Sequence, residues 1–211
     1  MEEVKAERVG IMGGTFDPIH YGHLVAAETA REAFSLDRII FVPAGIPSHK
    51  AREKTTSGRH RYLMTILAIM SNPYFEVSRV DLDRGGVTYT VDTLSDLKRE
   101  LPPETEMYFI TGADAILEIQ SWKSPGEVLS MAEFIAATRP GYGLEHLSQA
   151  LGPLAVEFQD RIHILEIPPM GVSSTEVRHR LAKGKSVRYL LPETVITYIH
   201  NHGLYSTSQA R

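Results

Sequence analysis

The sequence predicts an α/β protein: a single doubly wound, Rossmann-like domain in which a mostly parallel sheet carries helices on both faces. Short apolar runs, typical of buried strands, alternate roughly five or six times with segments of helical apolar spacing. The 211 residues suffice for one domain with a sizeable core, and a content of 43% hydrophobic and 23% charged residues does not suggest disorder. We therefore expect one domain over 1–211, with an N-terminal extension at 1–8 and a flexible tail at 206–211.

Composition narrows the possible partners. The formal net charge of -4 argues against a general nucleic-acid surface, because binding to a phosphate backbone needs a basic excess. Residues 1–8 are charged and lack the apolar core of a signal peptide, and the longest apolar region, 62–70, is far shorter than the ~20 residues that span a bilayer. We expect a cytoplasmic protein with no nucleic-acid or membrane partner. The sequence is compatible with a homo-oligomer.

The first strand and helix enclose the most informative motif. The apolar run Val9–Met12 predicts a buried strand, followed by the stretch GGTFDPIHYGH at 13–23. Its two leading glycines allow a tight turn close to a ligand, and the helical spacing that follows places His20 and His23 near a helix start. A helix N-terminus offers unpaired N–H groups and a partial positive charge. The turn therefore predicts an anion site where two imidazoles donate hydrogen bonds to a phosphate.

Three other interpretations of this stretch compete. The His-x-x-His spacing could bind zinc, but the chain has no cysteine and no carboxylate at an obvious spacing to complete a tetrahedral set. The glycines at 10, 13, 14 and 22 do not form the Gly-x-Gly-x-x-Gly pattern of a dinucleotide-binding turn, so a nicotinamide dehydrogenase is not indicated. The histidines could also be ordinary surface residues.

The stretch 13–23 resembles the signature of the nucleotidyltransferase superfamily that carries the His-x-Gly-His motif, in the form found in bacterial nicotinate-nucleotide adenylyltransferases. The resemblance extends from Val9 to Tyr205. It implies transfer of AMP from ATP, with Mg2+, to nicotinate mononucleotide, yielding deamido-NAD and pyrophosphate. Two alternatives stay open: another adenylyltransferase of the superfamily, such as a pantetheine-phosphate adenylyltransferase, and a catalytically silent nucleotide sensor.

A second strand is predicted at Arg38–Pro43, and the loop to Lys50 leaves its carboxyl end, where ligands bind in open parallel sheets. The loop residues 47–50, Pro-Ser-His-Lys, are similar to the family's Pro-Pro-His-Lys element, with Ser48 where the second proline is common. The ammonium of Lys50 can reach a phosphate as a point charge. A solvated surface lysine is the alternative.

The middle of the chain predicts a helix capped by Ser57 and ended by Asn72-Pro73, a short strand at 75–80, and a flexible loop at 84–93 that leads into a helix at 93–101. We expect the first of these helices to bury the stripe Tyr62, Leu63, Ile66, Leu67 and Met70. The resemblance implies that Tyr89 and Thr90, in the loop, bind the nicotinate nucleotide; helix capping is the alternative for the threonine.

Three further strands are predicted, at 107–111, 134–137 and 161–167, with a peripheral helix at 143–152. The resemblance implies that Gly112 and Asp114, after the first of these strands, line the nucleotide pocket, and that Trp122 packs beside the pyridine ring. It also implies that Arg139, in the Arg-Pro-Gly turn at 139–141, borders the adenine.

The last segment predicts a helix start where Ser173 and Glu176 have capping-box spacing, a stop at Gly184, and a final helix between Pro192 and Gly203. We expect this final helix to bury Val195, Ile196, Tyr198 and Ile199.

The predicted site residues lie on loops after strands or at the starts of the helices that follow, so a parallel sheet would bring them to one edge. The resemblance implies catalytic roles for His20, His23, Lys50 and Arg178, and nicotinate-nucleotide binding by Thr15, Tyr89, Thr90 and Trp122. It implies ATP binding by Gly13, Gly14, Thr15, Phe16, His20, His23, Lys50, Gly112, Asp114, Arg139, Ser174, Thr175 and Arg178. We expect no metal ligand from protein side chains alone, with Mg2+ held by the ATP phosphates, and no covalent nucleophile.

Overall fold

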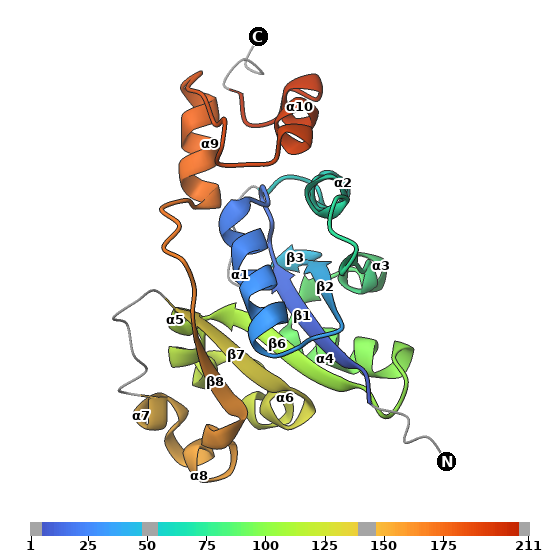
Figure 1. Ribbon diagram of the computed structural model, residues 1–211, viewed down its shortest axis with the longest axis vertical. Helices are drawn as coiled ribbons and strands as arrows, with labels where there is room; N and C mark the ends of the chain where they lie inside the picture. The colour runs from blue at the N-terminus through green and yellow to red at the C-terminus, as the bar shows by residue number, and fades with distance from the viewer. Residues whose placement is uncertain (1–5, 48–54, 139–146, 207–211) are drawn as a thin grey trace.

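The computed structural model describes residues 6–47, 55–138 and 147–206. Six parallel strands form the central sheet: β1 (Arg8–Gly14), β2 (Arg38–Pro43), β4 (Phe75–Val77), β6 (Glu106–Gly112), β7 (Glu133–Thr138) and β8 (Ile162–Glu166). Their order is β4-β2-β1-β6-β7-β8, which confirms the doubly wound fold (Figure 1). The order reverses between β1 and β6, and ligands of such sheets bind in the crevice outside the strand ends at that point.

Helices cover both faces of the sheet, each over its own apolar cluster. One face packs against α1 (Tyr21–Ala33), α2 (Gly58–Ile69), α9 (Ser174–Ala182) and α10 (Glu193–Asn201). The other packs against α3 (Val80–Arg84), α4 (Thr90–Glu100), α5 (Ala113–Leu117), α6 (Pro125–Met131), α7 (Leu147–Leu151) and α8 (Ala155–Phe158). In Figure 1, α1 crosses in front of the sheet, and α9 and α10 lie at the end of the molecule opposite α7 and α8.

A small two-stranded parallel sheet lies apart from the main one. It joins β3 (Ile46–Pro47), which follows β2, to β5 (Val87–Thr88), which precedes α4. The backbone N–H of Gly45 also donates a hydrogen bond to the Thr88 hydroxyl at 2.8 Å. These contacts tie the loop after β2 to the segment that leads into α4.

The buried face of α2 differs from the expected stripe. Met70 is 67% exposed, and the other four residues of that stripe are only partly buried. Met64 and Ile69 face the core instead, on the same side as Arg61, which is 1% exposed. Because α2 is apolar on most sides, the spacing of its apolar residues does not determine which face is buried. The burial of the Arg61 guanidinium determines it.

Several boundaries also differ from expectation. The strand predicted at 75–80 ends at Val77, because Val80–Arg84 forms the short helix α3. The loop predicted at 84–93 contains β5, and α4 begins at Thr90 rather than at residue 93. Helix α6 was not predicted, although Pro125 occupies its first turn, a position that favours proline. The peripheral helix is α7, whose predicted first residues, 143–146, lie outside the described residues.

Within the described residues, no helix combines the length and the apolar character needed to cross a bilayer. Three single turns of 3-10 helix complete the described structure: η2 (Ile119–Ser121), η3 (Gly152–Leu154) and η4 (Gln159–Arg161).

Candidate active site

The turn between β1 and α1 brings its two histidines into contact. His20 is the N-cap of α1 and His23 lies in the first turn of that helix. Their rings are stacked with 3.8 Å between centroids, and the backbone N–H of His20 donates to Nδ1 of His23 at 3.2 Å. Since Nδ1 accepts this bond, a neutral His23 carries its proton on Nε2. That N–H group is a donor with the polarity needed to bind a phosphate oxygen.

Burial keeps both imidazoles neutral. His20 is 7% exposed, and desolvation lowers its pKa to about 4 against an ordinary value of 6.5. Burial, and secondarily the neighbouring His20, lower the pKa of His23 well below the same value. At neutral pH the pair can donate hydrogen bonds but adds no positive charge. In the described structure, Nδ1 of His20 is buried without a hydrogen-bond partner.

The start of α9 packs against the same turn. The Ser174 hydroxyl donates to the carbonyl oxygen of Pro18 at 2.8 Å, and Nη1 of Arg178 donates to that of Asp17 at 2.7 Å. Nη2 of Arg178 lies 3.4 Å from the Thr175 hydroxyl. Ser173 caps the helix as predicted, accepting from the backbone N–H of Glu176 at 3.2 Å. The two helix starts that the sequence indicates for phosphate binding are therefore neighbours.

Beside the turn lies a cavity of about 730 Å3, bordered by the ends of β1 and β6 where the strand order reverses. Its size suits a small-molecule ligand. It brings together seven of the predicted site residues: Gly13, Gly14, Thr15, Tyr89, Thr90, Asp114 and Trp122. The Trp122 ring meets Phe109, another lining residue, edge to face with 6.1 Å between centroids.

The remaining predicted residues are not part of this lining. Five of them lie in or beside the segment 15–23, here called the histidine turn: His20, His23, Ser174, Thr175 and Arg178. Thr15, the first residue of the histidine turn, also lines the cavity. Lys50 and Arg139 lie outside the described residues, so their predicted roles stay predictions.

Phe16 and Gly14 serve the turn differently from expectation. The side chain of Phe16 is 1% exposed and belongs to the core, so only its backbone is available to a ligand. A Cβ atom on Gly14 would lie 2.7 Å from the Phe16 ring. Gly14 therefore leaves room for this aromatic side chain.

Further along the chain, Gly112 is the N-cap of α5, and Asp114 lies in the first turn of that helix.

Sequence reasoning missed several residues that line the cavity. Lys123 is the one basic residue among the described lining residues; its Nζ lies 3.1 Å from a carboxylate oxygen of Asp92 and 4.7 Å from the centroid of the Tyr89 ring. The single available signal was its position next to Trp122.

Asp81, 1% exposed, also lines the cavity, and burial raises its pKa. It accepts hydrogen bonds from Thr93 at 2.8 Å and from Arg84 at 2.6 Å.

Sequence reasoning also missed Arg61. Its guanidinium donates to three backbone carbonyl oxygens: those of Thr56 at 2.9 Å, Thr15 at 2.8 Å and Gly45 at 2.7 Å. A buried charge is costly unless its donors are satisfied, and these bonds satisfy it from three separate loops. Arg61 thereby fixes the histidine turn to the loops that follow β2 and precede α2.

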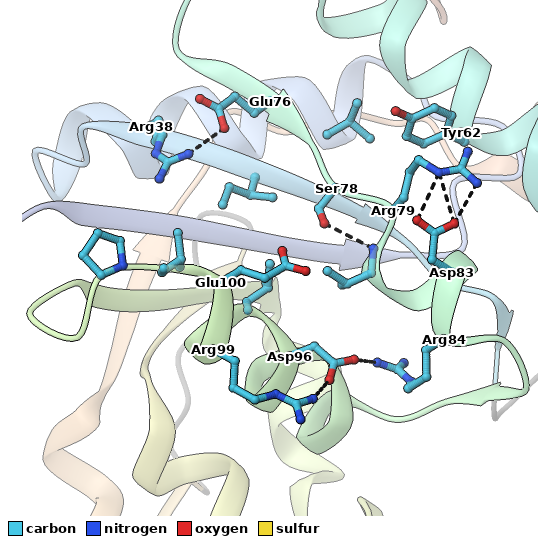
Figure 2. A pocket seen from close by; sticks show the side chains of 16 residues that line it. Arg38, Tyr62, Glu76, Ser78, Arg79, Asp83, Arg84, Asp96, Arg99 and Glu100 are labelled. Atoms are coloured by element: carbon cyan, nitrogen blue, oxygen red, sulfur yellow. Dashed lines mark hydrogen bonds and ion pairs between the residues drawn. The ribbon is translucent and has the colours of Figure 1, made fainter.

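Figure 2 shows a second hollow, of about 810 Å3, bordered by residues of β2, β4, α3 and α4. It is rich in arginine, but each labelled arginine points to a carboxylate: Arg38 to Glu76 at 2.6 Å, Arg79 to Asp83 at 2.7 Å, and Arg84 and Arg99 to Asp96. The positive charges of this hollow are therefore already paired within it.

Comparison with known proteins identifies the family. Residues 11–180 match the family model described as cytidylyltransferase-like. The chain is 56% identical over 198 residues to a probable nicotinate-nucleotide adenylyltransferase of Moorella thermoacetica, covering 94% of this chain and 91% of that protein. It is 51% identical over 202 residues to a protein of the same name from Thermoanaerobacter sp., covering 96% of each.

Solved structures agree in fold. Nicotinic acid mononucleotide adenylyltransferase of Plasmodium falciparum, complexed with NaAD, superposes with a TM-score of 0.74 at 23% identity, covering 94% of this chain and 97% of that one. The family match and the high identity over nearly the whole length lead to one conclusion: this chain belongs to the cytidylyltransferase-like family and, within it, to the nicotinate-nucleotide adenylyltransferases.

Proposed function

We propose that this protein transfers AMP from ATP to nicotinate mononucleotide, forming deamido-NAD and pyrophosphate. One observation carries the proposal: a turn with two neutral histidine donors, backed by the start of α9, lies beside a cavity lined by aromatic residues. A phosphate site next to an aromatic cavity matches a substrate that has both a phosphate and a flat ring.

The reaction is a direct transfer between two phosphates. A phosphate oxygen of the mononucleotide attacks the α-phosphorus of ATP, the bond from that phosphorus to the bridging oxygen breaks, and pyrophosphate leaves. The second pKa of a phosphate monoester is near ~6, so the attacking group is largely dianionic at neutral pH and needs little help from a base. The protein then contributes mainly by positioning the substrates and stabilising charge.

The histidine turn and α9 suit the ATP phosphates. Nε2–H of His23 and the buried His20 ring are donors that burial holds in the neutral state, so near neutral pH they act as uncharged N–H donors to anionic oxygens. The unpartnered Nδ1 of His20 fits a site that a ligand completes. Arg178 adds the positive charge. We propose that ATP enters as its Mg2+ complex, and that Lys50 and Arg139 also contact it.

The cavity suits the mononucleotide. Tyr89 and Trp122 contribute aromatic rings to its lining for contact with the pyridine, and Thr90 contributes a hydroxyl group. The Lys123 ammonium lies over the Tyr89 ring at this end of the cavity and is paired with Asp92, so a nicotinate carboxylate would exchange places with Asp92 and gain an ion pair that a nicotinamide amide does not gain.

A pyrophosphate-release assay with ATP and a panel of phosphate acceptors tests the proposal. We expect nicotinate mononucleotide to exceed its amide analogue by at least about tenfold in kcat/KM, a difference that needs only ~1.4 kcal/mol. Preference for phosphopantetheine would identify another adenylyltransferase, and binding of ATP without pyrophosphate release would identify a nucleotide sensor. A cytoplasmic location and a homo-oligomer stay predictions.

A further inference from the structure

Tyr205, near the end of the chain, contacts the histidine turn across a sequence separation of 188 residues. Its hydroxyl donates to Oδ1 of Asp17 at 2.5 Å. The other carboxylate oxygen, Oδ2, accepts the backbone N–H of Thr56 at 3.1 Å, and the carbonyl oxygen of Asp17 accepts from Arg178. Asp17 is 4% exposed. This buried carboxylate therefore joins the end of the chain and the segment before α2 to the turn that holds both histidines.

The backbone on both sides of this contact adopts an uncommon conformation. Tyr205 has a φ of 62°, and Phe16, the residue before Asp17, has a φ of 48°. Bulky residues rarely occupy this left-handed region, and they stay there only where surrounding contacts hold them. For Phe16 those contacts include the rings of Phe41 and His23, at 5.8 and 5.1 Å between centroids.

Arg61 links the same network to the cavity. It donates to the carbonyl oxygen of Thr56, whose N–H is bound by Asp17, and to the carbonyl oxygen of Thr15, which begins the turn. The contacts thus run from Tyr205 through Asp17 and Thr56 to Arg61 and back to the turn. Burial, and secondarily Asp17, raise the pKa of the Tyr205 hydroxyl above its ordinary value, so it remains a donor across the working pH range.

We propose that Tyr205 is a positioning residue for the transfer reaction: through Asp17 it fixes the turn that carries His20 and His23. The inference rests on the proposed function for its kinetic consequence. Donors that stabilise a transition state must be held in place before the reaction, and a small displacement costs rate more than it costs substrate binding. Loss of the Tyr205 hydroxyl should therefore lower kcat and leave the KM values nearly unchanged.

Tyr205→Phe tests this with a change of one oxygen atom, and Tyr198→Phe is the matched control. The Tyr198 hydroxyl lies 2.8 Å from Nδ1 of His60, so it ties α10 to α2 without contacting the turn. We expect Y205F to lower kcat about tenfold, with both KM values within about twofold of wild type, and Y198F to keep kcat within about twofold. Equal kcat losses in the two variants, or none in Y205F, would overturn the proposal.

Two further measurements separate positioning from general stability. Adding Y205F to Asp17→Ala should lower kcat no further than Asp17→Ala alone, because the acceptor of the Tyr205 hydroxyl is then already absent; additive losses would contradict the proposal. Hydrogen exchange at the amides of Ile19–His23 should be faster in Y205F than in Y198F, and equal rates would contradict it. This second readout needs no turnover, so it decides the positioning role even if wild-type protein releases no pyrophosphate with nicotinate mononucleotide. Should Y205F fail to fold, Asp17→Ala takes its place in the exchange experiment.

Discussion

The imidazole of His23 accepts a hydrogen bond from the backbone N–H of His20 while the two rings lie stacked against each other. This arrangement fixes which nitrogen of His23 is the donor. It also places two ionisable groups side by side in a desolvated position, where adding a proton to either one is unfavourable.

Stability should therefore fall in mild acid. Between about pH 6.5 and pH 4 the unfolded chain binds protons at these histidines and the folded chain does not, so the free energy of unfolding decreases as the pH is lowered through this window. His20 alone should account for roughly 3 kcal/mol. Urea denaturation at a series of pH values measures the slope. His20→Asn should flatten it. A slope identical to that of the wild type would mean that His20 binds a proton as readily in the folded protein as in the unfolded chain.

Removal of the His23 donor should impair the chemical step. We expect His23→Ala to lower kcat by roughly a hundredfold, because the donor gains strength as charge develops on the phosphate. Steady-state kinetics measures this, with circular dichroism to verify the fold. His163→Ala is the control, since His163 lies on β8 with Nε2 2.9 Å from Glu133, and its kcat should stay within about twofold. Full activity of His23→Ala would exclude a catalytic role.

Replacement of Arg178 should weaken the binding of ATP more than that of the mononucleotide. Arg178→Ala removes a cation from the predicted triphosphate site and should raise the KM for ATP. It should also lower kcat, because negative charge moves toward the departing pyrophosphate and because Asp17 loses a donor. Kinetics with each substrate varied in turn gives both constants. Arg180→Ala, on the same helix, is the control, since its Nε bonds the carbonyl oxygen of Ser186 instead. An effect on the mononucleotide alone would mean that the subsites are reversed.

Replacement of Trp122 should weaken the binding of nicotinate mononucleotide. Trp122→Ala removes a flat apolar contact of order ~1 kcal/mol, which corresponds to about a fivefold increase in the KM for nicotinate mononucleotide. The KM for ATP should change little. Trp122→Phe keeps an aromatic face and should recover most of the loss. If ATP binding alone weakened, the assignment of the cavity to the pyridine would be wrong.

The sequence predicted the four central strands of the sheet well because they are buried on both sides. Such strands read as continuous apolar runs, and the predicted run Arg38–Pro43 coincides with β2. It predicted α2 in the right place but with the wrong buried face. The position of Arg61 in the core depends on carbonyl groups from three distant loops, and no local pattern encodes that requirement.

The site was predictable where a motif carries it and less so elsewhere. The stretch 13–23 indicated a phosphate site, and the end of β1 and the start of α1 enclose it as expected. Asp81 and Lys123 could not be placed, because only the packing of α3 and α4 and the segment after η2 brings these separate residues to one cavity. Tyr205 was missed for the same reason, since its partner lies at the other end of the chain.

The pairing of β3 with β5 has a consequence for how the cavity responds to a ligand. Pro47 and Thr88, on these strands, both line the cavity, so a ligand that displaces one strand must displace the other or break their hydrogen bonds. A ligand in this cavity therefore contacts two loops that cannot adjust independently. Such coupling is reciprocal: by whatever factor the ordering of one loop favours the ordering of the other, the converse holds by the same factor.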